Sequence, residues 1–190
     1  MKCPNCKDKE LLPKEIEPGL IIAECFTCDG QLFPLMNYRH WLKIQTSATK
    51  TSKPDVNSSE AKPAEVTRIE AVEDSKNVKV CPNCSHFLAK FNIGSGSSNK
   101  LELCNHCDHA WLDAGEWAML KSLGLEKNLA KIFTDAWQYQ VRKEHQREHL
   151  DERYKKILGE SDFNKVKAFK DWLDQQPEKS AIKQYLITEI

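Results

Sequence analysis

Two short segments, Cys81-Pro82-Asn83-Cys84 and Cys104-Asn105-His106-Cys107, are Cys-x-x-Cys pairs that stand 19 residues apart. The start of the chain has the same arrangement, with Cys3-Pro4-Asn5-Cys6 and Cys25-Phe26-Thr27-Cys28 separated by 18 residues. These four pairs contain all eight cysteines of the chain, so no thiol is left over. A chain that pairs every thiol in this way is predicted to build two four-sulfur metal sites, one in each block.

The metal predicted for these sites is zinc. Zn²⁺ has no geometric preference of its own and is held by four thiolates in a tetrahedron. Two sulfurs separated by two residues can bind one ion when the backbone makes a tight turn, here called a knuckle. Four protein ligands leave no position for water or substrate, so we expect two structural Zn²⁺ ions with no hydrolytic role. The predicted ligands are Cys3, Cys6, Cys25 and Cys28 for the first ion, and Cys81, Cys84, Cys104 and Cys107 for the second.

Other uses of the cysteines are open at this point. Disulfides are disfavoured because Cys-x-x-Cys pairs of a cytosolic chain favour metal, and a redox dithiol would need only one pair. Iron is the remaining alternative, because four thiolates accept it too. Rubredoxin-like iron knuckles usually carry Gly after the second cysteine, whereas this chain has Lys7, Asp29, Ser85 and Asp108 there. That difference favours zinc.

The chain of 190 residues divides into four parts by composition. Residues 1–45 are predicted to form zinc ribbon 1, and residues 78–124 to form zinc ribbon 2 with a helix after it. Residues 46–77 have no aromatic residue and are rich in Ser, Thr, Lys, Glu and Pro, so we expect a flexible, disordered linker that cannot bury a core. Residues 125–190 are predicted to be a charged helical tail. We therefore expect bead-like modules rather than one merged core.

Each cysteine block has the pattern of a β-hairpin. Two apolar runs flank a turn signal in both, namely Glu17-Pro18-Gly19 in the first block and the Gly/Ser-rich residues 94–99 in the second. Aligning the last cysteines of the two blocks pairs Leu32-Phe33 with Trp111-Leu112 without a gap. The blocks are therefore predicted to be an internal repeat of a zinc-ribbon hairpin.

The chain after the second block has the apolar spacing of amphipathic helices. A helix is predicted from about Ala114 to Leu123, with Asp113 and Glu116 as its capping box.

An apolar stripe then runs from Leu125 to Val141 and resumes at Leu150, and Gly159 can stop that helix. Ser161-Asp162 is predicted to cap the next helix, and a last short helix is expected from Ala181. Together these patterns predict a C-terminal helical hairpin or small bundle.

Composition and charge argue against several function classes. The apolar runs are only a few residues long, so no membrane span is expected. The first metal motif begins at Cys3, which leaves no room for a signal peptide, and we therefore expect a cytoplasmic protein. Basic and acidic residues number 28 each and balance within every part of the chain, whereas a nucleic-acid-binding segment usually has a basic surplus.

Residues 81–120 resemble the bacterial zinc-ribbon family named after general transcription factor IIB. Its pattern is Cys-Pro-x-Cys, a hairpin, then Cys-x-x-Cys-x-Gly-x-Trp-Leu-Asp-x-Gly-Glu-Leu. The matching residues are Cys81, Pro82, Cys84, Cys104, Cys107, Trp111, Leu112, Asp113, Gly115 and Glu116. His109 replaces the usual Gly and Trp117 the usual Leu. Residues 3–42 resemble the family more weakly, with Leu32-Phe33-Pro34 in place of Trp-Leu-Asp. The resemblance implies a zinc-binding ribbon, and only the family's name suggests transcription.

These patterns predict a non-enzymatic zinc-binding protein whose two Cys₄ ribbons act as a protein-interaction module. The alternative is a nucleic-acid-binding, transcription-associated factor. A third reading, an enzyme or metal-handling protein, would use His145 and His149, which stand at i and i+4 in a run of charged residues. The expected partner is a protein, no membrane is involved, and a homo-oligomer through the 125–158 helix is open.

Overall fold

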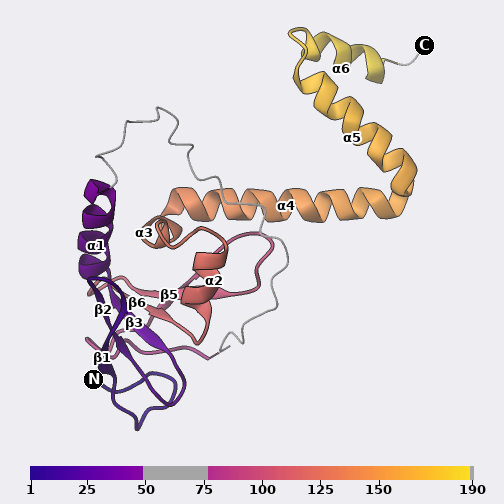
Figure 1. Ribbon diagram of the computed structural model, residues 1–190. Coiled ribbons are helices and arrows are strands. Elements are labelled where there is room, and N and C mark those ends of the chain that lie inside the picture. Colours follow the sequence, from indigo (N-terminus) through magenta and orange to yellow (C-terminus); the bar gives the residue numbers. More distant parts are fainter. Residues whose placement is uncertain (49–76, 189–190) are drawn as a thin grey trace. The chain divides into compact units, whose positions relative to one another are not determined.

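The computed structural model describes residues 1–48 and 77–188 (Figure 1). In these ranges the chain forms one antiparallel sheet and six helices. The strands are β1 (Leu12–Glu17), β2 (Leu20–Glu24), β3 (Gln31–Pro34), β4 (Ala89–Asn92), β5 (Lys100–Cys104) and β6 (His109–Leu112). The helices are α1 (Leu35–Ala48), α2 (Glu116–Ser122), α3 (Leu129–Ile132), α4 (Asp135–Leu158), α5 (Glu160–Asp174) and α6 (Lys179–Ile187). The chain divides into two compact units, Met1–Glu144 and His145–Ile190.

One continuous sheet contains the strands of both cysteine blocks. Its order is β1-β2-β3-β6-β5-β4, and every neighbouring pair is antiparallel. The blocks meet where β3 pairs with β6, with Leu32 opposite Trp111 and Phe33 opposite Ala110. The expectation of separate, bead-like modules is therefore wrong. The physical reason is that each block has a third strand with adjacent apolar residues, which point to opposite faces of the sheet and need cover on both.

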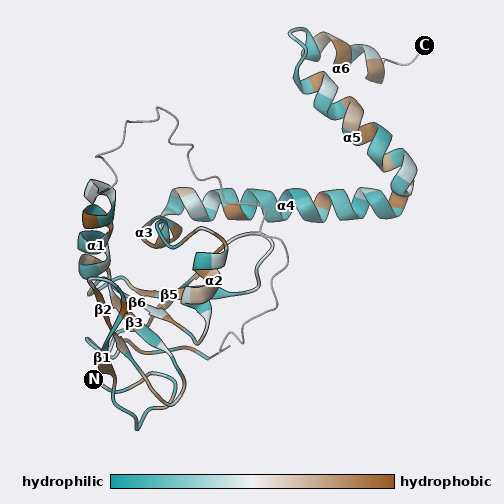
Figure 2. Cartoon of the chain, viewed as in Figure 1, coloured by the Kyte–Doolittle hydropathy of each residue, from teal (hydrophilic) through white to brown (hydrophobic). Residues whose placement is uncertain are grey.

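Helices α1, α2 and α3 and the start of α4 cover one face of the sheet (Figure 1). Phe33, Ala110 and Leu112 point to this side and pack in the main core of the unit. The other buried members of that core are Leu20, Ile22, Leu35, Tyr38, Trp41, Ile93, Leu101, Leu103, Trp117, Met119, Leu120, Leu125, Leu129, Ile132, Trp137 and Val141. Figure 2 shows the resulting contrast between the apolar segments of the sheet and the largely hydrophilic surface of α4.

Leu32 and Trp111 point to the other face, where they pack with cysteines of both blocks. Trp111 is fully buried. Its six-membered ring lies against Gly30, because a Cβ added at Gly30 would stand 2.2 Å from Trp111 Cζ2. A large side chain of the second block thus occupies the space that a glycine of the first block leaves open. Trp111 is a packing residue that joins the two blocks.

Helix α1 was not predicted from the sequence, yet it helps to position the chain after α2. Tyr38 is fully buried. Its hydroxyl donates a hydrogen bond to the carbonyl oxygen of Glu126 at 2.8 Å and accepts one from the N–H of Leu129 at 3.2 Å. Burial raises the pKa of Tyr38, so the hydroxyl keeps the proton that it donates. The first three residues of the predicted linker are also not separate from the fold, since α1 continues to Ala48.

The apolar stripe from Leu125 to Val141 does not form one helix. It is divided between α3 and α4, and Thr134 Oγ1 accepts a hydrogen bond from the N–H of Trp137 at 3.3 Å in the first turn of α4. The buried members of the stripe belong to the main core, namely Leu125, Leu129, Ile132, Trp137 and Val141. A homo-oligomer cannot use this part of the predicted 125–158 helix, because the protein's own sheet covers it.

The unit His145–Ile190 contains the second part of α4, together with α5 and α6. Gly159, with φ of 76°, separates α4 from α5 as expected. The predicted cap at Ser161-Asp162 is wrong, because α5 begins at Glu160 and its N-cap position is Gly159, without a side-chain cap bond. Among the described residues, no helix has both the length and the apolar character needed to cross a bilayer. The rest of the predicted linker, residues 49–76, lies outside the described residues.

The Gly30–Trp111 contact gives a prediction about stability. Gly30→Ala should lower the free energy of unfolding by about 1–3 kcal/mol, because its methyl group overlaps the indole ring. In a Trp111→Phe background the same substitution should cost much less, because Phe lacks the two indole atoms closest to Gly30. Denaturant unfolding of the metal-loaded wild type, both single variants and the double variant measures this coupling. Simple additivity of the two single effects would contradict the contact.

Candidate metal centres

All four Cys-x-x-Cys segments fold into the same turn. In each one, the N–H of the residue after the second cysteine donates a hydrogen bond to the carbonyl oxygen of the first cysteine. The four N···O distances, in chain order, are 2.8, 2.8, 2.9 and 3.0 Å. These following residues are the non-glycine residues with positive φ in the described ranges: Lys7 (62°), Asp29 (52°), Ser85 (62°) and Asp108 (57°). A left-handed backbone costs about 1–2 kcal/mol at a non-glycine residue. The absence of Gly therefore does not change the turn, and it does not separate zinc from iron.

The four sulfurs of each block converge on one point. Within a group, all Sγ atoms lie within 4.8 Å of one another. The shorter separations are 3.5 Å for Cys3–Cys28, 4.0 Å for Cys6–Cys25, 3.5 Å for Cys81–Cys107 and 3.3 Å for Cys84–Cys104. Four thiolates at about 2.3 Å from a tetrahedral zinc ion would stand about 3.8 Å apart, whereas a disulfide has sulfurs about 2.05 Å apart. The two groups are therefore not disulfides and fit one metal ion each.

The predicted ligands are thus brought together in the groups that the sequence indicated. Cys3, Cys6, Cys25 and Cys28 form one group, and Cys81, Cys84, Cys104 and Cys107 form the other. In each group the first cysteine of either knuckle is buried and the second is half-buried. The described part of the chain has these two groups of potential metal ligands, and both could hold an ion.

The thiols of each block have very different proton affinities. Burial alone would raise the pKa of Cys25, but backbone N–H groups of its own knuckle and neighbouring sulfurs lower it to about 7. The same opposing effects bring the pKa of Cys104 to about 7. Burial raises the pKa of Cys3 and of Cys107 far above the ordinary value. Each block therefore places a thiol that ionises readily, Cys25 or Cys104, beside one that holds its proton, Cys3 or Cys107. Because zinc binds thiolates, metal binding should weaken as pH falls.

The histidines near the second group lie outside its ligand set. The His106 ring stacks on the ring of His86, with centroids 4.0 Å apart. His109 Nδ1 lies 2.7 Å from the carbonyl oxygen of Cys107. His145 and His149 are exposed, and in the described ranges they belong to no group of three potential metal ligands. The candidate centres are therefore built from sulfur alone.

A buried polar network joins the two blocks next to these centres. Lys79 is only 3% exposed, and its Nζ donates to Glu102 at 2.8 Å and to Asp113 at 2.6 Å. Asp113 also accepts hydrogen bonds from Trp111 Nε1 and Asn5 Nδ2, both at 2.9 Å. Because Asn5 belongs to the first knuckle of the chain, one carboxylate connects the first block to the second. Burial would lower the pKa of Lys79, but its bonds to the two carboxylates raise it, so the ammonium stays charged.

The predicted capping box of α2 is half formed. Glu116 Oε2 accepts a hydrogen bond from the N–H of Asp113 at 2.7 Å, as the glutamate of a capping box does. The Asp113 carboxylate is engaged by the buried network, and the N-cap residue Gly115 has no side-chain cap bond. Burial would raise the pKa of Asp113, but the bond from Lys79 and the other bonds of the network lower it. Asp113 is therefore an ionised residue of the network that connects the two blocks. Its predicted role as a helix cap considered only the helix that follows it and could not reveal these contacts.

Sequence reasoning did not identify Lys79, Glu102 or Asn5. The available signal was a charged residue between two apolar ones, as in Val78-Lys79-Val80 and Leu101-Glu102-Leu103. Such an alternation in a strand usually places the charge in solvent and the apolar residues inside. Only the tertiary pairing shows that both charged residues are buried and face each other.

No family model, curated protein or solved structure matches this chain. The metal centres are therefore identified by their own residues and geometry.

The two sulfur groups predict the metal content of the protein. After a chelator challenge that leaves the wild type with two ions, Cys28→Ser and Cys107→Ser should each retain about one, because each removes one ligand of one centre. The double variant should retain none, and the exposed knuckle variant Thr27→Ser should retain two. Elemental mass spectrometry measures the content and distinguishes zinc from iron. Loss of both ions in each single variant would show that the centres are not independent.

Glu116 should make stability fall as pH rises. Burial raises its pKa from 4.5 to about 8, so between these values the folded protein holds a proton that the unfolded chain has lost, and rising pH favours unfolding. Glu116→Gln keeps an acceptor for the N–H of Asp113 but cannot ionise. Relative to this variant, the free energy of unfolding of the wild type should fall by up to about 1.4 kcal/mol for each unit that the pH rises between about pH 5 and 8.

Denaturant unfolding of the metal-loaded pair over this range measures the difference. The subtraction cancels the pH dependence of the thiolate centres, which both proteins share. A difference that does not change with pH would contradict the prediction.

Proposed function

We propose that this chain is a non-enzymatic zinc-binding protein whose two cysteine ribbons act as a protein-interaction module. Four sulfurs would supply every ligand of each tetrahedral ion, which leaves no open position for water or substrate. The buried Lys79, Glu102 and Asp113 are engaged in ion pairs with one another inside the fold. The resemblance to the bacterial zinc-ribbon family supports zinc as the ion and stability as its role.

The observation that carries this proposal is an inverted strand pattern at the start of the second block. Lys79 is buried, whereas Val78 is 74% exposed and Val80 is 41% exposed. Because successive side chains of an extended segment point to opposite sides, the burial of Lys79 turns both valines outward. Phe87, which pairs with Val80 in an isolated bridge, is 75% exposed. We name these three residues, Val78, Val80 and Phe87, the Val80 patch.

The corresponding bridge of the first block is polar. It joins Lys2 to Glu10, both of which are exposed. The apolar pair of the second block is therefore not required by the bridge itself. Exposing roughly 300 Å² of apolar surface gives no folding benefit, and an apolar patch of this size is often functional.

The chemistry of the Val80 patch favours a protein over a nucleic acid. Its own lysine, Lys79, is buried and paired with two carboxylates, so the patch offers no exposed cation from within. Nucleic-acid binding depends on exposed Lys and Arg that neutralise phosphates, and the chain as a whole has a formal net charge of zero. An apolar side chain of a protein partner fits this surface better. The transcription-associated, nucleic-acid-binding function is the competing outcome of the experiment below.

Site-specific photo-crosslinking tests the proposal in the native cell. A photoreactive phenylalanine analogue is placed at Phe87, and at Met36, which is 77% exposed on α1, as a matched control. We expect a discrete protein adduct from position 87 that is absent from position 36. The adduct yield should fall at least tenfold when Val80→Asp is added, while the metal content stays at two ions.

Two results would count against the proposed function. Identical adducts from both positions would show that the Val80 patch has no special role. Nuclease-sensitive adducts at position 87 would instead favour the nucleic-acid-binding alternative.

A further inference from the structure

The unit His145–Ile190 exposes most of its large apolar side chains. Among its described residues only Phe163 and Leu173 are buried, and α6 has no buried residue. The exposed ones are Leu150, Tyr154, Ile157, Leu158, Val166, Phe169, Trp172, Tyr185, Leu186 and Ile187. Short helices without tertiary packing are marginal in water, so these helices need a surface to cover their apolar side.

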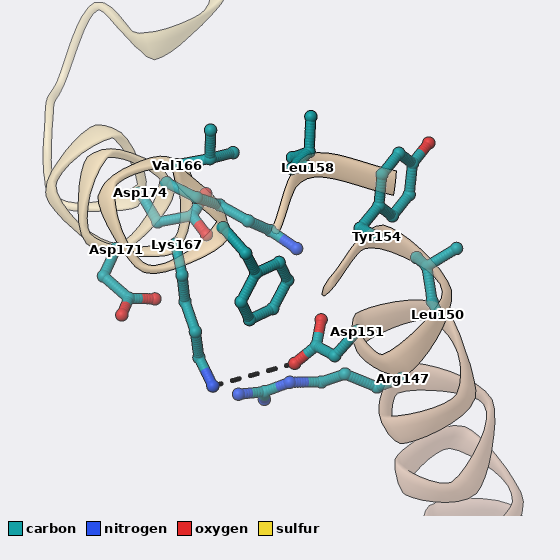
Figure 3. Close-up of a pocket in the computed structure, with 11 residues that line it drawn as sticks. Arg147, Leu150, Asp151, Tyr154, Leu158, Val166, Lys167, Asp171 and Asp174 are labelled. Atoms are coloured by element: carbon teal, nitrogen blue, oxygen red, sulfur yellow. Dashed lines mark ion pairs between the residues drawn. The ribbon is translucent and has the colours of Figure 1, made fainter. Parts of the chain in front are cut away.

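A groove between α4 and α5 gathers part of this surface (Figure 3). It has a volume of about 390 Å³, and its apolar lining consists of Leu150, Tyr154, Leu158, Phe163 and Val166. Gly159, at the turn between the two helices, has φ of 76° and ψ of 160°, which directs α5 away from the line of α4. The Asp151–Lys167 ion pair, at 3.7 Å, connects the two helices across the groove. The groove is thus a defined feature of this unit.

The charges around the groove are equal in number and opposite in sign. Its basic residues are Arg147, Lys167 and Lys170, and its acidic residues are Asp151, Asp171 and Asp174. Residues 145–190 as a whole also contain nine basic and nine acidic side chains. A surface of this kind does not attract an anionic membrane or a nucleic acid strongly. It does match a copy of itself, because a two-fold axis can place the lysines of one copy opposite the aspartates of the other.

The apolar lining of the groove would form the centre of such a contact. Leu150, Tyr154, Leu158 and Val166 are between 39% and 52% exposed, and together they offer about 350 Å² per copy. A stable interface buries about 800 Å² per partner, so the charged side chains of the rim supply more than half of the area.

We propose that the α4–α5 groove binds the same groove of a second copy, so that the chain forms a two-fold dimer. The apolar linings then cover each other, and the rim charges pair across the axis. This dimer uses neither the metal centres nor the Val80 patch, so it does not rest on the proposed function. It also differs from the 125–158 seam suggested by the sequence, since only the exposed second half of α4 takes part.

Analytical ultracentrifugation of the full, metal-loaded chain over about 0.1–100 μM measures the association. The wild type should pass from the monomer mass of 21.9 kDa to twice that mass. Tyr154→Glu and Val166→Glu should each raise the dimer Kd at least tenfold, because each places a charge in the apolar lining. Tyr139→Glu, an exposed position on the same helix but outside the groove, should leave the Kd unchanged. Far-UV circular dichroism and metal content confirm that the variants fold.

A charge exchange identifies the partner as the same groove. Lys167→Glu/Lys170→Glu makes the rim acidic and Asp171→Lys/Asp174→Lys makes it basic, so each variant should be monomeric alone. An equimolar mixture should restore the dimer, because the altered rims are then complementary.

Three results would overturn the proposal. The first is a wild-type protein that stays monomeric at the highest concentration, whether or not that monomer binds anionic vesicles. The second is a dimer that Tyr154→Glu and Val166→Glu do not weaken. The third is a mixture of the charge variants that remains monomeric.

Discussion

The antiparallel pairing of β3 with β6 is the constraint on which the rest of the larger unit depends. It places both sulfur groups on the same face of one sheet, and the helices on the other. Alignment of the two blocks makes Leu32 correspond to Trp111, and these two residues lie opposite each other in the sheet. Antiparallel strands that pair at corresponding positions are related by a two-fold axis. We infer that the two blocks are arranged as the halves of a symmetric dimer would be.

The departures from this symmetry are complementary in size. At the central pair the first block has Leu32 and the second has the much larger Trp111. Beside them, the first block has Gly30, against which the indole packs, and the corresponding position of the second block is His109. A larger residue on one side of the axis is thus matched by a smaller one on the other. Close packing then favours the pairing of unlike blocks over the pairing of two identical ones.

The sequence was sufficient for local features and insufficient for those that depend on contact between blocks. Short-range spacing was enough to predict the grouping of the eight cysteines, the two hairpins and the end of a helix at Gly159. The structure has all three features. The four-residue strands β3 and β6 are too short to have a clear period, and α1 lacks acidic residues in its first turn and basic residues in its last turn. The roles of Lys79 and Asp113 depend on residues 23 to 108 positions away, which no local pattern encodes.

Burying the charged network of Lys79, Glu102 and Asp113 costs desolvation free energy, and a gain in folding stability does not account for its presence. In the described part of the chain, Glu102 Oε2 and Glu116 Oε1 are buried without a hydrogen-bond partner. Buried ion pairs of this kind are often no more stable than apolar residues of the same volume. A shift of the segment by one residue would bury Val78 or Val80 and expose Lys79, which is the more favourable choice by apolar burial alone. The carboxylates of Glu102 and Asp113 oppose that shift, because it would leave them buried without their cation. We infer that the network specifies the strand register, and in doing so keeps the valines at the surface.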